Sequence, residues 1–136
     1  MMSDCIFCKI IKGELPSAKV YEDDDILAFL DIGPVHKGHT LVIPKEHHET
    51  ILDIPDELLQ KQITIVKKLT KAVKTAVKAD GITIGQSNYK YGGQVVPHIH
   101  FHIMPRFKDD GLKLWPQGEY EEGEMETIKE KIIESI

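Results

Sequence analysis

The sequence lacks long apolar runs and an excess of basic residues, and each absence excludes a class of protein. Nothing in it approaches the roughly 18 consecutive apolar residues that a membrane-spanning helix needs. The N-terminal MMSDCIFCKI has no basic segment followed by a long apolar stretch, so we expect no secretory signal. A net charge of −5 argues against broad binding to a nucleic-acid backbone, which needs a basic surface. We therefore expect a cytoplasmic protein that binds neither membranes nor nucleic acid.

Cysteine is also scarce, because the chain has only Cys5 and Cys8. In a cytoplasmic protein this pair stays reduced, which disfavours a structural disulfide. A thioredoxin-like redox motif normally follows a strand, and only four residues precede Cys5. Two interpretations remain open from the residues alone. The thiols are buried as small apolar side chains, or they bind zinc together with two further ligands.

The composition that is present fits one soluble globular domain. The chain has 136 residues, of which 41% are hydrophobic and 29% charged. No repeat or long linker divides it, so we expect a single domain over residues 1–136. Acidic residues concentrate in GEYEEGEMETIKE, so that residues 119–136 form an acidic C-terminal tail.

The pattern of apolar residues and turn residues predicts an α+β domain. A short helix is expected over 4–13, with Asp4 as its N-cap and Gly13 at its end. A long helix is expected over 55–79, beginning at Pro55 and closed by Gly81. Apolar residues also recur on one side of 125–136, where we expect a terminal helix. Five strands, predicted over 18–23, 25–31, 39–44, 82–88 and 98–104, indicate an antiparallel five-stranded sheet.

Three of the seven histidines stand at alternate positions in VVPHIHFHIMPR. In a strand, alternate side chains point to the same face, so His98, His100 and His102 would share one face about 7 Å apart. The apolar residues between them would then pack on the core. A solvated polar face rarely consists of histidine alone, which favours a chemical role for the row.

Two chemical roles suit such a row. A metal centre built from all three imidazoles would often include a carboxylate, yet no Asp or Glu lies between Gly92 and Lys108. Alternatively, a neutral imidazole can attack phosphorus through a covalent intermediate. Such chemistry needs donors for the phosphoryl oxygens, and Asn88, Gly93 and Gln94 lie just before the row. The residues alone do not exclude either role.

The motif HIHFHIM matches His-φ-His-φ-His-φ-φ, where φ is apolar, so the chain resembles the histidine triad (HIT) superfamily. CIFCKIIKGELPSAKVYEDDDILAFLDI, GHTLVIPKEH and the GGQ before the triad are similar to its Hint-like nucleotide-binding branch. The similarity extends from about Asp4 to Gly118. It implies a HIT-like fold with one long and one short helix, a homodimer, and a purine nucleotide such as AMP as ligand. The activity implied is hydrolysis or nucleotidyl transfer on purine nucleoside 5′-phosphoramidates or related adenylates.

The resemblance also assigns catalytic roles to individual histidines. His100, in the middle of the triad, would be the nucleophile that accepts the nucleotidyl group. His102 would contact the phosphate and assist the leaving group or the water. His39, in GHT, would support the triad.

The nucleoside pocket implied by the resemblance lies in FLDI and near the N-terminus. Asp31 would accept hydrogen bonds from the ribose hydroxyls, and Phe29 and Ile32 would line the base and sugar site. Ile6 and Phe7 would cover the base. The apolar members of this set are equally consistent with plain core packing.

Some Hint-like proteins that resemble this one carry one structural zinc per chain, and the resemblance implies that the ligands here would be Cys5, Cys8, His47 and His98. His48 is the rival for the third position. This assignment would separate His98 from the two histidines that act on phosphorus.

Two positions depart from the commonest Hint-like pattern. Val95 stands where a Ser or Thr hydroxyl often contacts the phosphate or leaving group, and Pro97 stands directly before the triad. A lost hydrogen bond in the transition state costs about 1–3 kcal/mol, so we expect slower turnover rather than none. The alternatives are a zinc-stabilised nucleotide- or partner-binding module with little turnover, and a dinucleoside polyphosphate hydrolase, in which MPR also follows the triad.

Overall fold

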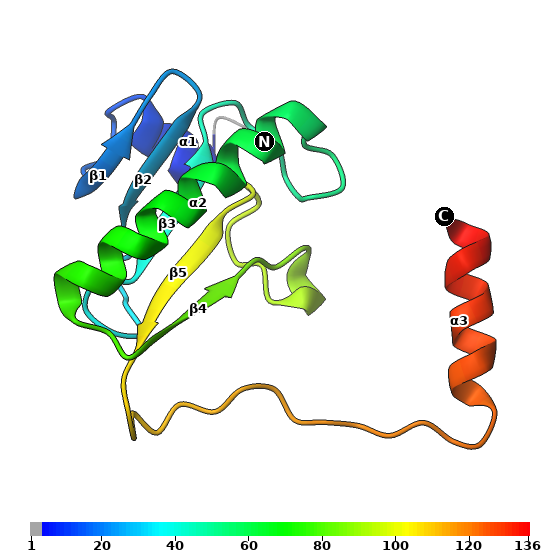
Figure 1. Ribbon diagram of the computed structural model, residues 1–136. Helices are drawn as coiled ribbons and strands as arrows, with labels where there is room; N and C mark the ends of the chain where they lie inside the picture. The colour runs from blue at the N-terminus through cyan, green and yellow to red at the C-terminus, as the bar shows by residue number, and fades with distance from the viewer. Residues whose placement is uncertain (1–3) are drawn as a thin grey trace.

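The computed structural model describes residues 4–136, which form one antiparallel sheet flanked by helices (Figure 1). The strands are β1 (Lys19–Glu22), β2 (Ile26–Leu30), β3 (Thr40–Pro44), β4 (Gly81–Gly85) and β5 (Phe101–Arg106). The helices are α1 (Ile6–Ile11), α2 (Asp56–Val77) and α3 (Glu124–Ser135). The strand order is β1-β2-β3-β5-β4, and each neighbouring pair is antiparallel. The α+β fold with a five-stranded antiparallel sheet is therefore confirmed.

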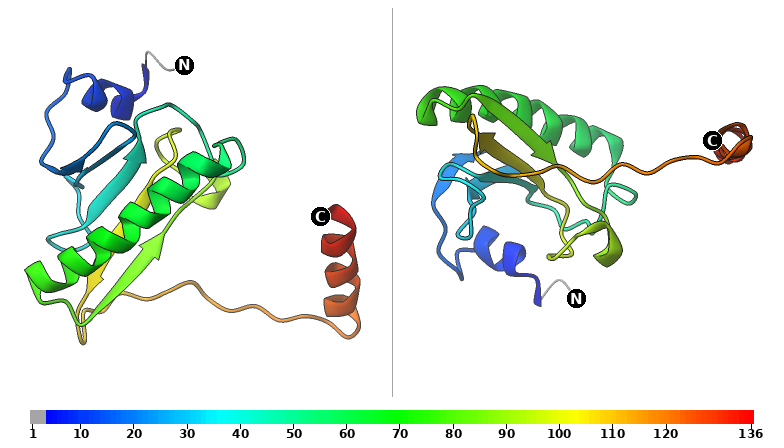
Figure 2. Two further views of the ribbon diagram at one scale, coloured as in Figure 1. Left: turned by 45° about the horizontal axis from the view of Figure 1, so that its top comes forward. Right: turned by 90° about the horizontal axis from the view of Figure 1, so that it is seen from below.

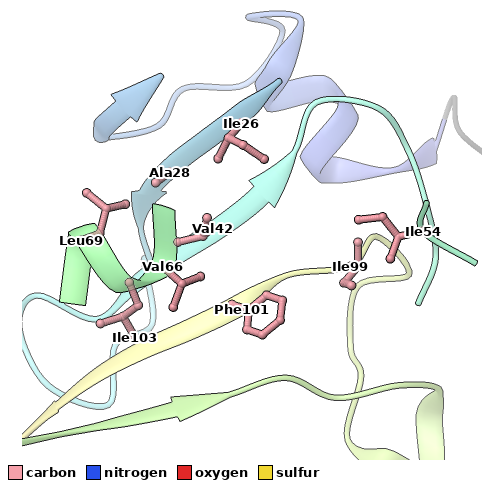
Figure 3. Close-up of a cluster of buried hydrophobic side chains, with 9 residues drawn as sticks. All are labelled: Ile26, Ala28, Val42, Ile54, Val66, Leu69, Ile99, Phe101 and Ile103. Atoms are coloured by element: carbon pink, nitrogen blue, oxygen red, sulfur yellow. The ribbon is translucent and has the colours of Figure 1, made fainter. Parts of the chain in front are cut away.

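The two faces of the sheet pack against different helices, α2 on one side and α1 on the other (Figure 2). Alternation along β2 produces this division, because Ile26 and Ala28 face α2 whereas Leu27 and Phe29 face α1. Figure 3 shows the core beneath α2, formed by Ile26, Ala28, Val42, Ile54, Val66, Leu69, Ile99, Phe101 and Ile103. The second core lies beneath α1 and contains both cysteines.

The long helix forms where the apolar stripe predicts it, but its ends differ from the prediction. Pro55 is the N-cap residue, and the helix begins at Asp56, where two acidic side chains favour the positive end of its dipole. At the other end Lys78 adopts a left-handed conformation (φ 56°) and its N–H donates to Lys74 and Thr75 carbonyl oxygens. Gly81 does not close the helix, because the chain has already turned and Gly81 begins β4.

The strand that carries the histidines begins later than predicted. Only His102 lies within β5, whereas His98 and His100 precede it. Pro97 has no N–H to donate, and the N–H of Ile99 donates to His48 outside the sheet (2.8 Å). The predicted alternation still holds, since Ile99 and Phe101 are buried in the core beneath α2. Likewise β4 ends at Gly85, so residues 86–88 lie outside the predicted strand.

The C-terminal segment leaves the body of the protein as an extended arm that ends in α3 (Figure 1). The expected terminal helix is present, and all of its residues are exposed in the single chain. Within residues 4–136, the helices are too short or too polar to cross a membrane.

Candidate active site and metal centre

The structure divides the histidine row between two sites on the α1 side of the sheet. His98 joins a cluster of sulfur and nitrogen atoms beneath α1, whereas His100 and His102 line a neighbouring pocket. The three imidazoles therefore do not form one metal centre, although the rings of His100 and His102 are only 4.9 Å apart.

The first site brings together Cys5, Cys8, His47 and His98, whose candidate ligand atoms all lie within 4.8 Å of one another. Cys5 and Cys8 are both free thiols. Cys5, rather than Asp4, caps α1, because its sulfur accepts a hydrogen bond from the Cys8 N–H (3.4 Å). The two sulfurs consequently lie within 4.8 Å of one another. The rival ligand His48 does not belong to this group, and its Nε2 pairs with Glu46 Oε1 (2.6 Å).

The spacing of these atoms fits a tetrahedral zinc ion. The His98 Nδ1 atom lies 3.4 Å from Cys5 Sγ and 3.6 Å from Cys8 Sγ, and the His47 Nδ1 atom lies 3.3 Å from Cys8 Sγ. The two Nδ1 atoms are 3.1 Å apart. Ideal tetrahedral zinc bonds place sulfur and nitrogen about 3.6 Å apart and two nitrogens about 3.3 Å apart. The four residues therefore match a structural zinc ion both in the kinds of ligand atom and in the distances between those atoms.

Hydrogen bonding prepares His98 to act as a ligand. Its Nε2–H donates to the carbonyl oxygen of Pro44 (2.8 Å), which leaves Nδ1 without a proton and directed at the cysteines. Burial lowers the pKa of His98 to about 4, so the ring is neutral at physiological pH. Burial and then the neighbouring Cys5 raise the pKa of the Cys8 thiol to about 11 in the metal-free protein.

The second site is a pocket of ≈ 540 Å³ between α1, the end of β2 and the start of β5. It brings together most of the residues expected to bind a nucleotide or react with it. These are Ile6, Phe7, Phe29, Asp31, Ile32, Gly93, His100 and His102. The sequence did not indicate Ile10 and Leu15, which also line the pocket. Their apolar character is equally typical of core residues.

His100 presents an unprotonated nitrogen to this pocket. Its Nδ1–H donates to the carbonyl oxygen of His98 (2.8 Å), so the proton resides on Nδ1 and the lone pair on Nε2 is free. Burial lowers the pKa of His100, which keeps the ring neutral. The ring of Phe7 stands edge-on to it at 5.0 Å and holds its orientation. A neutral, oriented imidazole is the form that can attack an electrophile.

A chain of hydrogen bonds determines which nitrogen of His102 carries the proton. The backbone N–H of Val35 donates to His39 Nδ1 (3.0 Å), so His39 is protonated on Nε2 and donates to His102 Nδ1 (2.9 Å). His102 consequently carries its own proton on Nε2. Burial is the main cause that lowers the pKa of His102, to about 4, and also lowers the pKa of His39.

The carboxylate of Asp31 lies beside this chain, with Oδ2 3.7 Å from His39 Nε2. Asp31, His39 and His102 therefore resemble a two-histidine, one-carboxylate metal site. The Val35 N–H argues against that interpretation. It occupies His39 Nδ1, so the proton of neutral His39 sits on the nitrogen that a metal would need. The hydrogen bonds therefore favour a relay, in which the protonated Nε2 of His39 donates to His102, over a metal site.

Two expected phosphate donors lie outside the lining of the pocket. Gln94 uses both amide hydrogens within the protein, donating to the carbonyl oxygens of Glu49 (2.6 Å) and Val96 (3.0 Å). The Asn88 side chain accepts from the Ile51 N–H and exchanges hydrogen bonds with Gln86. Gly93, by contrast, lines the pocket and adopts a φ of 98°, which favours glycine.

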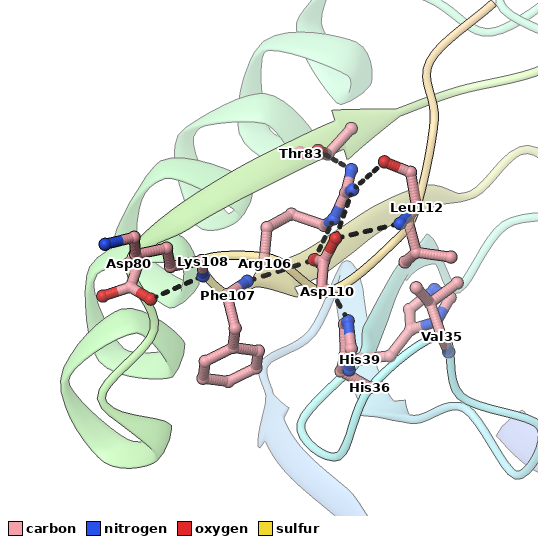
Figure 4. Close-up of polar contacts among 10 residues, drawn as sticks. All are labelled: Val35, His36, His39, Asp80, Thr83, Arg106, Phe107, Lys108, Asp110 and Leu112. Carbon is pink, nitrogen blue, oxygen red and sulfur yellow. Dashed lines mark hydrogen bonds and ion pairs between the residues drawn. The ribbon is translucent and has the colours of Figure 1, made fainter.

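A polar network anchors the loop that carries Val35 (Figure 4). The Asp110 carboxylate pairs with both Nε and Nη2 of Arg106 (2.8 and 3.0 Å) and with Nε2 of His36 (3.2 Å). The Arg106 guanidinium lowers the pKa of Asp110 far below its usual range. The sequence alone does not indicate this role for His36, because its partner Asp110 lies 74 positions further along the chain.

A family model described as the HIT domain matches residues 12–109. The chain belongs to the HIT family. Adenosine 5′-monophosphoramidase HNT1 of Candida albicans is 39% identical over 141 residues, which cover 98% of this chain and 92% of that protein. A HIT family protein of Bacillus subtilis has a solved structure that is 41% identical and superimposes with a TM-score of 0.90 over 98% of this chain and 97% of its own.

A zinc-bound histidine triad family protein of Mycobacterium smegmatis is also similar. It is 32% identical and has a TM-score of 0.79, with both chains covered completely (100% each). These relatives confirm the family and the fold that the motifs predicted.

Proposed function

We propose that this protein cleaves purine nucleoside 5′-phosphoramidates or related adenylates, by hydrolysis or nucleotidyl transfer, through a covalent nucleotidyl-His100 intermediate. The proposal rests on one observation: the unprotonated Nε2 of His100 lies in a pocket lined by apolar side chains and Asp31. The activity named for the Candida albicans relative supports the class of substrate.

The two pocket histidines have complementary protonation for this reaction. His100 Nε2 would attack phosphorus as the bond between phosphorus and the amine nitrogen breaks. The Nε2–H of His102, which His39 positions through Nδ1, would donate a hydrogen bond to the amine nitrogen, which takes up a proton from solvent as it leaves. A water molecule would then displace the nucleotide from His100 and release one proton to solvent, so that the two steps together consume one water and leave both imidazoles neutral. The hydrogen bonds thus define an acceptor on His100 and a donor on His102 before the reaction begins.

Backbone donors suit the phosphoryl oxygens better than the side chains of Asn88 and Gln94 do. Within residues 4–136, the N–H groups of Val95 and Val96 donate no hydrogen bond, and both residues line the pocket. They can therefore stabilise negative charge on the phosphoryl group. At the opposite end, Asp31 uses one oxygen to hold the Gly33 N–H (2.8 Å), which leaves acceptor capacity for ribose hydroxyls.

The proposal includes one structural zinc per chain, held by Cys5, Cys8, His47 and His98, in a cytoplasmic homodimer. When bound, zinc would cross-link α1 to the segment before β5 and take no part in the reaction. The zinc-bound Mycobacterium smegmatis relative and the ligand distances support this assignment.

Steady-state kinetics on adenosine 5′-phosphoramidate test the nucleophile. His100→Ala should lower kcat/KM by at least about 10³-fold, because the covalent route is lost. The matched control is His48→Ala, which removes an imidazole that lies outside the pocket and pairs with Glu46. It should retain wild-type activity. Turnover by His100→Ala at the wild-type rate would contradict the mechanism.

The same assay separates the two alternatives. A binding module would bind AMP without releasing an amine from the substrate. A dinucleoside polyphosphate hydrolase would prefer substrates in which two nucleosides are joined through phosphates. Val95, which provides no hydroxyl at the boundary of the pocket, motivates the binding module. The MPR that follows the triad motivates the dinucleoside polyphosphate hydrolase.

A further inference from the structure

A second hollow lies beside the nucleotide pocket, and Gly93 and Val95 line both. It has a volume of ≈ 730 Å³, and its other walls include Tyr89, Tyr91 and Pro97. The nucleoside and phosphate sites proposed above leave it unused. Because the two hollows share walls, a molecule that reacts at His100 can extend from one into the other.

The second hollow presents an exposed apolar and aromatic surface. Tyr91 is 100% exposed, Val95 90% and Tyr89 52%. Exposed aromatic and apolar side chains beside a reactive pocket provide a surface on which an apolar part of a substrate can pack. Lys90 and Glu49 contribute one charge of each sign, so the hollow favours neither a cationic nor an anionic ligand.

The loop that carries these side chains is held in one conformation. Tyr89 adopts φ 64° and ψ 163°, a backbone region that residues other than glycine rarely occupy. Gln94 stabilises it, because Gln94 Oε1 accepts from the Tyr89 N–H (2.7 Å) and the Gln94 N–H donates to the Tyr89 carbonyl oxygen (3.0 Å). A backbone held in this way loses little conformational entropy when a ligand binds.

We infer that this hollow is the binding site for the leaving group, and that it selects uncharged amines with an aromatic side chain. The inference rests on the function proposed above. The nucleoside occupies the part of the pocket between α1 and β2, so the amine has to extend toward another wall. Gly93 and Val95 form the wall that adjoins the second hollow, where the rings of Tyr91 and Tyr89 can pack against an aromatic amine.

Two substrates that differ only in the amine test this selectivity. Adenosine 5′-phosphoramidate releases ammonia, whereas its N-benzyl derivative releases benzylamine. The wild type should have the higher kcat/KM for the benzyl substrate. Tyr91→Ala should reduce the ratio of the two kcat/KM values by about tenfold, because one aromatic contact is lost. Tyr91→Phe should retain the ratio, and so should Tyr120→Ala, which removes an exposed tyrosine on the C-terminal arm.

Equilibrium binding separates a failure of this inference from a failure of the proposed chemistry. In the His100→Ala background, the benzyl compound should bind more tightly than the unsubstituted amide. Adding Tyr91→Ala should remove most of that advantage. Equal affinity for the two ligands, or an advantage that survives Tyr91→Ala, would overturn the leaving-group site. This result holds whether or not the wild type proves to use His100 as a nucleophile.

Discussion

Val35 acts through its backbone, and for that reason its contribution to the site cannot be read from its side chain. Its N–H determines the tautomer of His39, which in turn determines the tautomer of His102. The family resemblance indicated that His39 supports the triad, although not that it donates to His102. The sequence could not indicate Val35, because the hydrogen bond depends on the path of the loop rather than on residue type.

The buried relay predicts a pH dependence of stability. Burial lowers the pKa of His102 from 6.5 to about 4, and the neighbouring His100 and His39 reinforce the shift. Between these pH values the unfolded chain binds more protons than the folded protein, so folding stability from this group is lost as the pH falls. His102→Asn removes the titrating group. The free energy of unfolding should therefore fall less steeply from pH 6.5 to 4 in His102→Asn than in the wild type.

Denaturant titrations at half-unit steps of pH provide the measurement. The difference between the two unfolding curves should be constant above about pH 6.5 and should change below it. Parallel behaviour of wild type and His102→Asn over the whole range would show that His102 is not held neutral by the fold.

At the scale of elements, α1 links the cluster of candidate zinc ligands to the proposed nucleotide pocket. Its Cys5 and Cys8 face His98, while Ile6 and Ile10 line the pocket. The sequence predicted the helix but placed its N-cap at Asp4. The sulfur of Cys5 provides the cap instead, which residue preferences do not anticipate. Local hydrogen bonds also explain why β5 begins later than predicted. The His98 side chain donates to the Pro44 carbonyl oxygen and the Ile99 N–H donates to the His48 carbonyl oxygen, so this segment bonds outside the strand ladder.

Removal of zinc should loosen α1 before it unfolds the rest of the chain. A chelator should increase tryptic cleavage after Lys9 and Lys12, which lie at the end of α1, and should weaken AMP binding in parallel. Cleavage after Lys129 in α3 provides an internal control and should not change. Added zinc should reverse both effects. Unchanged cleavage at Lys9 and Lys12 in a sample shown to have lost its metal would contradict this coupling.

At the scale of the whole molecule, the residues that line the pocket show which of its members the sequence predicted and which it missed. The family resemblance placed Asp31, His100 and His102 at one site, and all three line the pocket. Ile10 and Leu15 were not predicted, because an apolar pocket wall and an apolar core use the same residue types. The side chains of Asn88 and Gln94 were expected near phosphate, but both form hydrogen bonds within the loops instead.

A prediction about the oligomeric state concerns the C-terminal arm and α3. The apolar side chains Met125, Ile128 and Ile132 of α3 are exposed in the single chain, and the family resemblance implies a homodimer. Light scattering coupled to size-exclusion chromatography should give twice the chain mass of 15.4 kDa. A mass of one chain over the micromolar concentration range would refute the dimer.

The most direct test of the account is to observe the nucleotidyl group on His100. The enzyme is mixed with excess adenosine 5′-phosphoramidate, stopped in alkaline denaturant to preserve the bond between phosphorus and nitrogen, and examined by intact-mass spectrometry and peptide mapping. We expect one adenylyl group on the peptide that contains His100, and none in His100→Ala. An adenylyl group on another residue, or rapid amine release with no adduct on His100, would contradict this expectation.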